Sequence, residues 1–311
     1  MNTTLEPLVD QIRLIRNHFL IPNRIVQNRS YTEYTHEVDK ALAEGYKVGT
    51  ELPIRFVIFT FPRSGSNLLC SMLNFHPEII CHHELFNPTR IYYSKDFHEL
   101  YGSSEVISRK DLTSGKKGIS TIRERNLFPE SFIVKVWQYN FSFNAVGFNL
   151  FPSHIPNAAM SLIKDKNVKK ILLLRHDKIK CYVSRLIAKK TGTWDLYNRF
   201  RDTSENALIT VNPNRLLNWS RKYDQYFYSL RQNLIKSEQN FMVLTYEDLI
   251  SDKSKSIKSS LLEFIGVSVH PNYLQSPLAK QNSNSLANLV SNFNELEEKL
   301  LGTELEPLLY K

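Results

Sequence analysis

Short hydrophobic segments recur along the chain and predict the strands of a β-sheet. Each is rich in β-branched or aromatic residues and is bounded by polar or turn-forming residues. Between these segments, apolar residues recur at helical spacing, as around Leu68–Leu73. Strands that alternate with helices favour an α/β fold, in which helices flank both faces of a parallel sheet. The predicted strands are Arg55–Thr60, Phe132–Trp137, Lys170–Leu174 and Phe241–Thr245.

The loop Pro62–Asn67 (PRSGSN) joins the first predicted strand to the first predicted helix. A tight turn before a helix directs backbone N–H groups and the positive end of the helix dipole at one point, which suits a phosphate. Gly65 allows the backbone to approach the anion closely. The loop lacks the paired glycines and the Gly-Lys of a Walker A motif, so it also lacks that motif's magnesium ligand. An ordinary strand-turn-helix connection is the alternative. The side-chain donors are those of Arg63, Ser64, Ser66 and Asn67.

The first fifty residues contain two further amphipathic segments, Leu5–Leu20 and Tyr31–Ala43. Both predict helices, so we expect an N-terminal helical extension (1–50) followed by one large domain (51–311). The extension could form a lid or a dimer contact, but packing on the domain is the preferred role. With 311 residues, of which 42% are hydrophobic, the chain can bury a full core.

The formal charge of +9 suits an anionic cofactor, and it would equally suit nucleic acid or an anionic membrane surface. Zinc-ligand spacing, an aromatic RNA-binding signature and a long basic stripe are all missing, so no nucleic-acid partner is expected. The apolar runs are too short to span a bilayer, and the N-terminus lacks the order of a secretion signal. Three cysteines, an odd and small number, indicate a reducing compartment. We expect a soluble cytoplasmic protein of undetermined oligomeric state.

The stretch Pro62–Pro88 resembles the opening of sulfotransferases that use 3′-phosphoadenosine 5′-phosphosulfate (PAPS), above all their bacterial, carbohydrate and tyrosylprotein branches. Those enzymes have a Pro-Arg-Ser/Thr-Gly-Ser/Thr loop, a helix, a His-Pro pair and an acidic residue before a Leu-Phe-Asn-Pro-like stretch. This chain has PRSGSN, His76-Pro77 and Glu84-Leu-Phe-Asn-Pro in that order. Asn67 stands where the family usually has Thr or Ser. The resemblance implies that the 5′-phosphate is bound by Arg63, Ser64, Gly65, Ser66, Asn67 and Leu68.

A second matching segment, Lys170–Leu186, contains a strand, a charged break and an amphipathic helix. At this junction the family carries an Arg and a Ser, about two helical turns apart, that hold the 3′-phosphate of the cofactor. Ser184 fits the Ser. Arg175 is preferred over His176 for the Arg, because guanidinium has a permanent charge and two-pronged donor geometry. A helix-capping Arg and a surface Ser are the alternative.

Two more matches lie toward the C-terminus. Phe241–Val267 contains a strand, a Tyr-Glu-Asp-Leu sequence and a helix, as the sulfotransferases do. The resemblance places Tyr246 near the adenine, whereas the two acidic residues after it are expected to organise the turn and cap the next helix. Ala279–Leu286 resembles a loop that closes over the nucleotide, with Lys280 as a candidate phosphate ligand or simply a solvated residue. Four matches in order, from Ile54 to Leu286, imply the family's P-loop-like α/β fold.

The sequence Cys-His-His-Glu at positions 81–84 raises the question of a metal. Adjacent residues of an extended segment point to opposite sides, so no metal site is expected there. Glu84 is instead the candidate general base. Tyrosylprotein-type relatives use a Glu at the matching point, and a carboxylate within reach can accept the proton of the attacking hydroxyl. A structural ion pair is the alternative role for Glu84. The alternative bases are His76, His82 and His83.

The resemblance implies direct, in-line sulfuryl transfer from PAPS, with 3′,5′-adenosine bisphosphate as the product and no metal. Arg63 and the loop N–H groups would stabilise the charge that grows on the leaving phosphate. The acceptor is expected to be a small-molecule natural product or an oligosaccharide, and hydroxyl or amine stays open. A metal-dependent small-molecule kinase and a non-catalytic nucleotide-binding protein are the alternatives. Four aromatic residues could line the acceptor pocket, although the core is preferred for them: Trp137, Tyr139, Phe141 and Phe143.

Overall fold

The computed structural model describes most of the region that carries the motifs. The described residues are 53–76, 78–94, 121–138, 143–154, 156–192, 208–251, 254–274 and 285–310. The two helices predicted in the first fifty residues lie outside these ranges, and so do Tyr139, Phe141 and Lys280.

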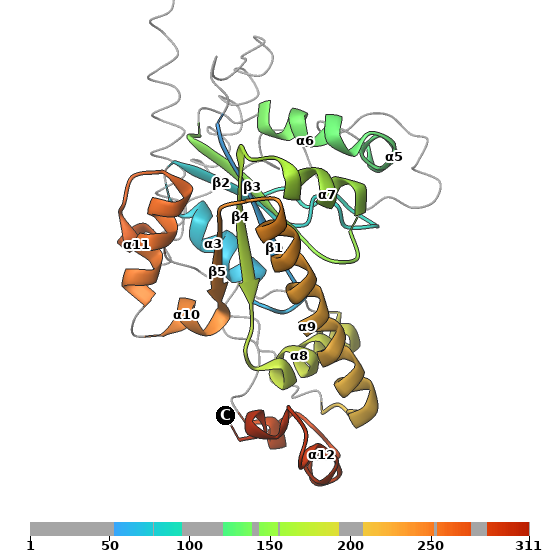
Figure 1. Cartoon of the computed structure of the whole chain (residues 1–311). Coiled ribbons are helices and arrows are strands. Elements are labelled where there is room, and N and C mark those ends of the chain that lie inside the picture. The colour runs from blue at the N-terminus through green and yellow to red at the C-terminus, as the bar shows by residue number, and fades with distance from the viewer. Residues whose placement is uncertain are drawn as a thin grey trace, which may run out of the picture.

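A parallel sheet of five strands, in the order β2-β3-β1-β4-β5, forms the centre of the described structure (Figure 1). Three of the four predicted strands are confirmed, and the last of them has the predicted bounds. The central position of β1 places the loop that follows it between the carboxyl ends of β3 and β4. The strands are β1 (Ile54–Thr60), β2 (Ile79–His82), β3 (Ala145–Leu150), β4 (Val168–Leu174) and β5 (Phe241–Thr245).

The predicted strand Phe132–Trp137 is wrong, because this segment lies within helix α6 (Pro129–Gln138). Its buried residues occur as two adjacent pairs, 132–133 and 136–137, and Val134 between them is exposed. That spacing marks one face of a helix, which the β-branched and aromatic composition had obscured. Trp137 and Phe143 are buried in the core, as the preferred alternative for these aromatics predicted.

Strands β2 and β3 were not predicted. Strand β2 has only four residues, and β3 contains Gly147, which is unfavourable in a strand. The glycine is required by packing, since a Cβ there would lie 2.2 Å from Cε2 of Phe56 on the neighbouring strand. This requirement involves a residue far away in the sequence and is invisible in the local pattern.

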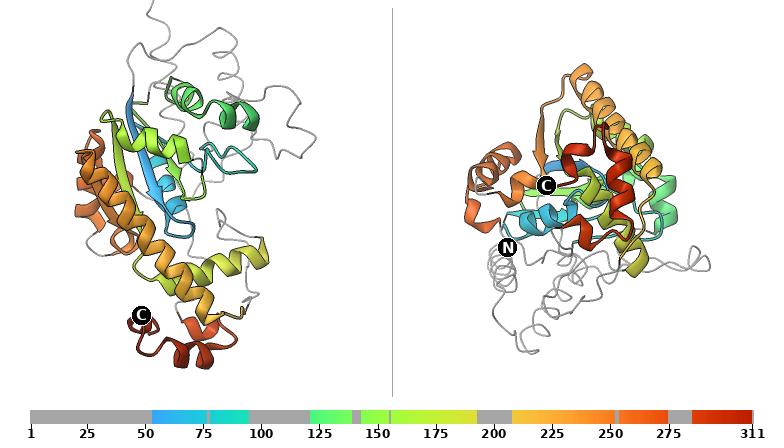
Figure 2. Two further views of the ribbon diagram at one scale, coloured as in Figure 1. Left: turned by 45° about the vertical axis from the view of Figure 1, so that its right-hand side comes forward. Right: turned by 90° about the horizontal axis from the view of Figure 1, so that it is seen from below.

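Helices cover both faces of the sheet (Figure 2). The helices are α3 (Ser66–Asn74), α5 (Ile122–Leu127), α6, α7 (Pro156–Lys164), α8 (Lys178–Thr191), α9 (Pro213–Lys236), α10 (Tyr246–Ile250), α11 (Ser254–Ile265) and α12 (Phe293–Leu300), with single 3-10 turns at Pro271–Tyr273, Leu286–Asn288 and Glu306–Leu308. Val57 and Phe59 of β1 face a core formed with α6, α7 and the C-terminal half of α9. Phe56 and Ile58 face the opposite core, formed with α3, α10 and α11. A third cluster joins α8, α9 and α12 beyond the carboxyl ends of the strands.

Candidate active site

The loop between β1 and α3 has the backbone of an anion-binding turn. Arg63 and Gly65 both adopt positive φ angles, of 72° and 94°. The N–H of Ser64 donates to the carbonyl of Phe61 at 3.1 Å, which closes the turn. Gly65 is the N-cap of α3 and provides no side-chain cap, so this end of the helix has the form of an anion-binding helix start.

Gly65 also allows Tyr246 to approach the loop. A Cβ at position 65 would lie 2.6 Å from Cδ2 of Tyr246, which is far inside van der Waals contact. Tyr246 is the first residue of α10, directly after β5. The sequence motif assigned Gly65 to close approach of an anion, and the structure adds close approach of an aromatic ring.

Arg175 links the end of β4 to this loop. Its guanidinium lies 4.5 Å from the centre of the Tyr246 ring, and its Nη1 donates to the carbonyl of Arg63 at 3.2 Å. The Nε of Arg63 in turn donates to Oγ of Ser184 at 3.0 Å. The fold therefore brings together four residues that the sequence singled out in three separate segments. His176, the other candidate at this junction, has an exposed side chain.

The backbone around Arg175 is held from two sides. Its N–H donates to the hydroxyl of Tyr223 at 2.6 Å, and that hydroxyl also contacts the carbonyl of Arg175 at 3.3 Å. The carboxylate of Glu247 accepts from the N–H groups of His176 and Asp177, at 3.1 and 3.2 Å. Sequence reasoning expected Glu247 to organise the turn after β5, whereas its carboxylate holds the turn after β4. It missed Tyr223, which is one of several aromatic residues on the long helix α9.

One donor of Arg175 indicates that a ligand belongs here. Its Nε is buried and has no hydrogen-bond partner among the described residues. Buried polar atoms are normally satisfied, so an orphaned guanidinium donor fits an anionic oxygen supplied from outside the chain. The residues present thus fit a phosphate-bearing cofactor.

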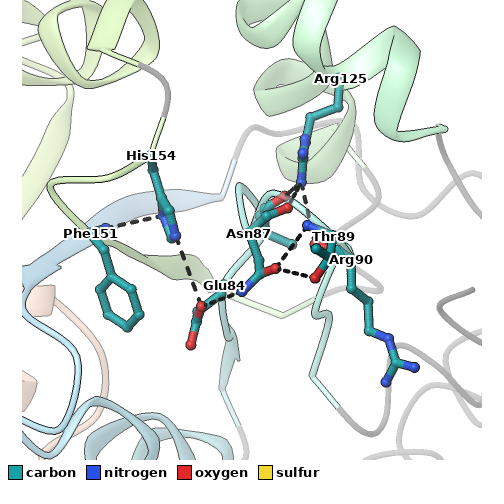
Figure 3. A network of polar contacts seen from close by, with 8 residues as sticks. Glu84, Asn87, Thr89, Arg90, Arg125, Phe151 and His154 are labelled. Carbon is teal, nitrogen blue, oxygen red and sulfur yellow. Dashed lines mark hydrogen bonds and ion pairs between the residues drawn. The ribbon is translucent and has the colours of Figure 1, made fainter. Parts of the chain in front are cut away.

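Glu84 lies beyond the carboxyl end of β2 and its carboxylate is partly accessible, with 24% of the side chain exposed. Its Oε2 accepts from Nδ2 of Asn87 at 2.8 Å and lies 3.9 Å from Nε2 of His154 (Figure 3). The alternative bases His76 and His82 are instead fully buried. Their ring nitrogens lie 3.0 Å from the carbonyl of Ser268 and 3.1 Å from the N–H of Ser94, respectively.

His154 was not singled out by the sequence. Its ring is buried, stacks on Phe151 at 5.0 Å, and accepts at Nδ1 from the N–H of Phe151 at 3.1 Å. Burial, with a contribution from the charge of Arg125, lowers the pKa of His154 to about 4. The ring is therefore neutral at pH 7. Because Nδ1 is an acceptor, its proton is on Nε2, the atom that faces Glu84.

The described residues contain no group of His, Cys, Asp or Glu side chains arranged to hold a metal ion. In the same part of the chain, no helix combines the length and the apolar character that a membrane crossing needs.

The comparisons with known proteins decide the family. The model of the sulfotransferase domain matches residues 53–309. The chain belongs to the sulfotransferase family. Nodulation protein H of Rhizobium tropici is 23% identical to it over 250 residues, which cover 80% of this chain and 90% of that protein. The predicted family is thus confirmed, and the five-stranded parallel sheet confirms the predicted fold class.

Two solved structures of sulfotransferases are similar to this one at low sequence identity. A sulfotransferase from Alicyclobacillus acidocaldarius is 13% identical, with a TM-score of 0.40, and covers 84% of this chain and 97% of its own. The sulfotransferase domain of the Synechococcus PCC 7002 olefin synthase is 17% identical, with a TM-score of 0.35, and covers 76% of this chain and 81% of its own.

The candidate site of this sulfotransferase has two parts, both at the carboxyl ends of the strands. The loops after β1, β4 and β5 form the part that contains Arg63, Arg175 and Tyr246. The segments after β2 and β3 form the part that contains Glu84 and His154. A hydrogen bond from the N–H of Asn149, in β3, to the carbonyl of His83 joins β3 to the segment after β2. A parallel sheet collects all five loops at one edge, which is why residues so distant in sequence meet.

Proposed function

We propose that this sulfotransferase moves a sulfuryl group from PAPS to a hydroxyl or amine of a small-molecule natural product or an oligosaccharide. PAPS is chosen as the sulfuryl donor because of Arg175, whose buried Nε has no hydrogen-bond partner among the described residues. Its guanidinium lies beside the turn of Arg63 and over the ring of Tyr246. A nucleotide with two separate phosphates would use both the uncapped start of α3 and this guanidinium. A donor with a single phosphate group would leave one of them unused.

The binding roles are those that the resemblance implies, and the geometry of the two candidate phosphate-binding elements supports them. The turn before α3 would hold the 5′-phosphate, and Arg175 with Ser184 would hold the 3′-phosphate. Tyr246 would contact the adenine, since its ring lies against both elements. Lys280, outside the described residues, is retained as a further phosphate ligand. The residues of this turn and of the start of α3 are Arg63, Ser64, Gly65, Ser66, Asn67 and Leu68.

PAPS would supply the sulfuryl group and a stable leaving phosphate. The protein would align the acceptor and stabilise charge, and no covalent intermediate is needed. Arg63 and the N–H groups of α3 would stabilise negative charge on the leaving phosphate. Glu84 would accept the proton of the attacking hydroxyl, and the neutral Nε2–H of His154 would orient its carboxylate. The 3.9 Å separation of these two side chains can shorten when an acceptor binds.

The proposal places the protein in the cytoplasm. All three cysteines are buried and free, and two of them, Cys70 and Cys81, have Sγ atoms 3.0 Å apart without a disulfide. Neighbouring free thiols suit a reducing compartment.

Ligand-dependent thermal stability tests the donor. We expect 3′,5′-adenosine bisphosphate to raise the melting temperature of the wild type strongly, and ATP with magnesium to raise it little, because tight binding stabilises by mass action. Arg175→Ala should lose the shift, whereas Arg221→Ala, a control at an arginine that is 68% exposed, should keep it. A shift with ATP and magnesium alone would favour a kinase and contradict the proposal.

Turnover tests the general base. Release of 3′,5′-adenosine bisphosphate from PAPS would be measured with a panel of oligosaccharide and small-molecule acceptors. Glu84→Gln should lower kcat by at least about 100-fold while the bisphosphate still binds as in the wild type. If the variant turned over normally, Glu84 would have no catalytic role. If neither protein released the bisphosphate with any acceptor, a non-catalytic nucleotide-binding protein would be favoured.

A further inference from the structure

Arg125 of α5 is one of the most deeply buried charged residues of the described structure, with 1% of its surface exposed. Its Nη1 donates to the carbonyls of Leu85, Asn87 and Arg90, at 2.7, 2.8 and 3.4 Å. Its Nε and Nη2 both donate to Oδ1 of Asn126. No carboxylate among the described residues pairs with it. Burying a guanidinium in this way is costly, so a specific use for it is expected.

The three carbonyls belong to the segment that follows Glu84. In this segment the N–H groups of Asn87 and Tyr92 both donate to the carbonyl of Glu84, at 3.2 Å. The side chain of Asn87 then donates to the carboxylate of Glu84 at 2.8 Å, while its Oδ1 accepts from Thr89. Figure 3 shows this chain of contacts from the Arg125 guanidinium through Asn87 to Glu84. Arg125 therefore holds the backbone of residues 85–90, and Asn87 of this segment holds the carboxylate of Glu84.

Arg125 also acts on His154, the other neighbour of Glu84. Among the described residues, the charged groups that act on His154 are Glu84, after β2, and Arg125, on α5. The N–H of Phe151 occupies Nδ1, and the positive charge of Arg125 opposes a second proton on the ring. Arg125 itself keeps its charge, because burial lowers its pKa only to about 10.

The protonation of His154 matters for the carboxylate beside it. A neutral imidazole presents a single Nε2–H to Glu84 and leaves the carboxylate able to accept a proton. A charged imidazolium would form an ion pair with Glu84 and stabilise its ionised form, which would make the carboxylate a weaker base.

We propose that Arg125 is a positioning residue, which orients Glu84 through the backbone of residues 85–90 and brings its positive charge to the side of the site where Glu84 and His154 lie. The proposal rests on the proposed role of Glu84 as general base. It assigns to a buried arginine, outside the candidate phosphate-binding motifs, control over the geometry and the charge of the acceptor side of the site.

The first test measures the titration of His154 and needs no substrate. Histidine resonances of ¹³C-labelled protein would be followed with pH, and His154 would be assigned from the spectrum of His154→Gln. In the wild type we expect His154 to titrate at about pH 4. In Arg125→Met it should titrate at least about one unit higher, because the opposing charge is gone. Arg125→Lys keeps the charge and should stay close to the wild type.

Arg55→Met is the matched control. Arg125 lies over the ring of Phe86 at 5.8 Å, and Arg55 likewise lies over an aromatic ring, that of Trp137, at 5.2 Å. Arg55 is more exposed than Arg125 and lies at the amino end of β1, the opposite end of the strand from the candidate site. This variant should leave the titration of His154 unchanged. If His154 titrated in folded Arg125→Met as in the wild type, or if Arg55→Met shifted it equally, the proposal would be wrong.

The second test uses Arg125→Lys, which also serves if Arg125→Met does not fold. A lysine cannot bind three carbonyls with the planar geometry of arginine. The carboxylate of Glu84 should therefore lose its orientation, while the positive charge at position 125 is kept. We expect kcat with PAPS to fall about tenfold or more, with the affinity for 3′,5′-adenosine bisphosphate unchanged. Unchanged kcat in this variant, or a parallel loss of bisphosphate affinity, would overturn the positioning role. Failure of PAPS as donor would leave the titration result intact, so the two proposals fail separately.

Discussion

Gly65→Ala is the most informative single change in this sulfotransferase, because it alters one methyl group at the point where three loops meet. The residue has a φ of 94°, and an added Cβ would lie 2.6 Å from Cδ2 of Tyr246. Tyr246 supports the guanidinium of Arg175 at 4.5 Å. The substitution should therefore strain the backbone, push the tyrosine ring away and disturb the arginine that we assign to the 3′-phosphate.

The expected cost has two contributions. A left-handed backbone costs an L residue about 1–2 kcal/mol. Carbon atoms normally stay about 3.5–4.0 Å apart, so the ring must move by about 1 Å, and overpacking of this kind costs about 1–3 kcal/mol. Together these give a loss of about 2–5 kcal/mol in the free energy of unfolding. Displacement of Arg175 would weaken a charge-assisted contact worth about 1.5–3 kcal/mol, which is about 10- to 100-fold in affinity for the bisphosphate.

Gly192→Ala isolates the backbone contribution. Gly192 ends α8 with a φ of 72°, and a Cβ there would meet no atom within 4 Å. Urea unfolding of both variants should show that Gly65→Ala loses about 1–3 kcal/mol more than Gly192→Ala. Isothermal titration with 3′,5′-adenosine bisphosphate should show weaker binding for Gly65→Ala only. Equal stability losses together with wild-type affinity in both variants would refute the reasoning from the Gly65–Tyr246 contact.

Two further predictions concern stability. The pKa of His154 is lowered from 6.5 to about 4, so between these pH values the unfolded chain binds a proton that the folded chain does not. The free energy of unfolding therefore has its full value above pH 6.5 and falls by up to about 3 kcal/mol as the pH drops toward 4. Between pH 7 and pH 5 the urea midpoint of unfolding should therefore fall further for the wild type than for His154→Gln. An identical pH dependence of the two proteins would contradict the lowered pKa of His154. In α6, Phe132→Ala should cost about 3–5 kcal/mol in urea unfolding, whereas Val134→Ala, at a position that is 46% exposed, should cost less than about 0.5 kcal/mol. Similar losses would contradict the burial pattern of this helix.

Hydrophobic and turn patterns predicted the strands and helices that neighbouring residues in the sequence determine. Strands β1, β4 and β5 are buried apolar runs that end in polar turns, and the helices after β1 and β4 start where such turns end. The segment Phe132–Trp137 misled because its composition suits a strand, while its burial period is helical. Strand β3 escaped detection because its glycine is explained only by the ring of Phe56 on the adjacent strand.

The candidate site divides in the same way. The motifs alone selected Arg63, Arg175 and Glu84, because a turn before a helix, a strand-to-helix junction and an acidic residue after the phosphate-loop helix are contiguous in sequence. Tyr223, His154 and Arg125 belong to no motif. Each is important through contacts with residues far away in the chain: the backbone of Arg175, the carboxylate of Glu84 and the carbonyls of residues 85–90.

The sequence by itself determined the fold class, because hydrophobic period and turn chemistry act over a few residues. Through its resemblance to sulfotransferases it also indicated the family and the residues that we expect to touch the phosphates. The tertiary structure alone decided that Tyr223 holds the backbone of Arg175, which tautomer of His154 faces Glu84, and that the charge of Arg125 acts on His154. Burial, hydrogen-bond partners and pKa values depend on groups brought together by a parallel sheet that gathers distant loops at one edge.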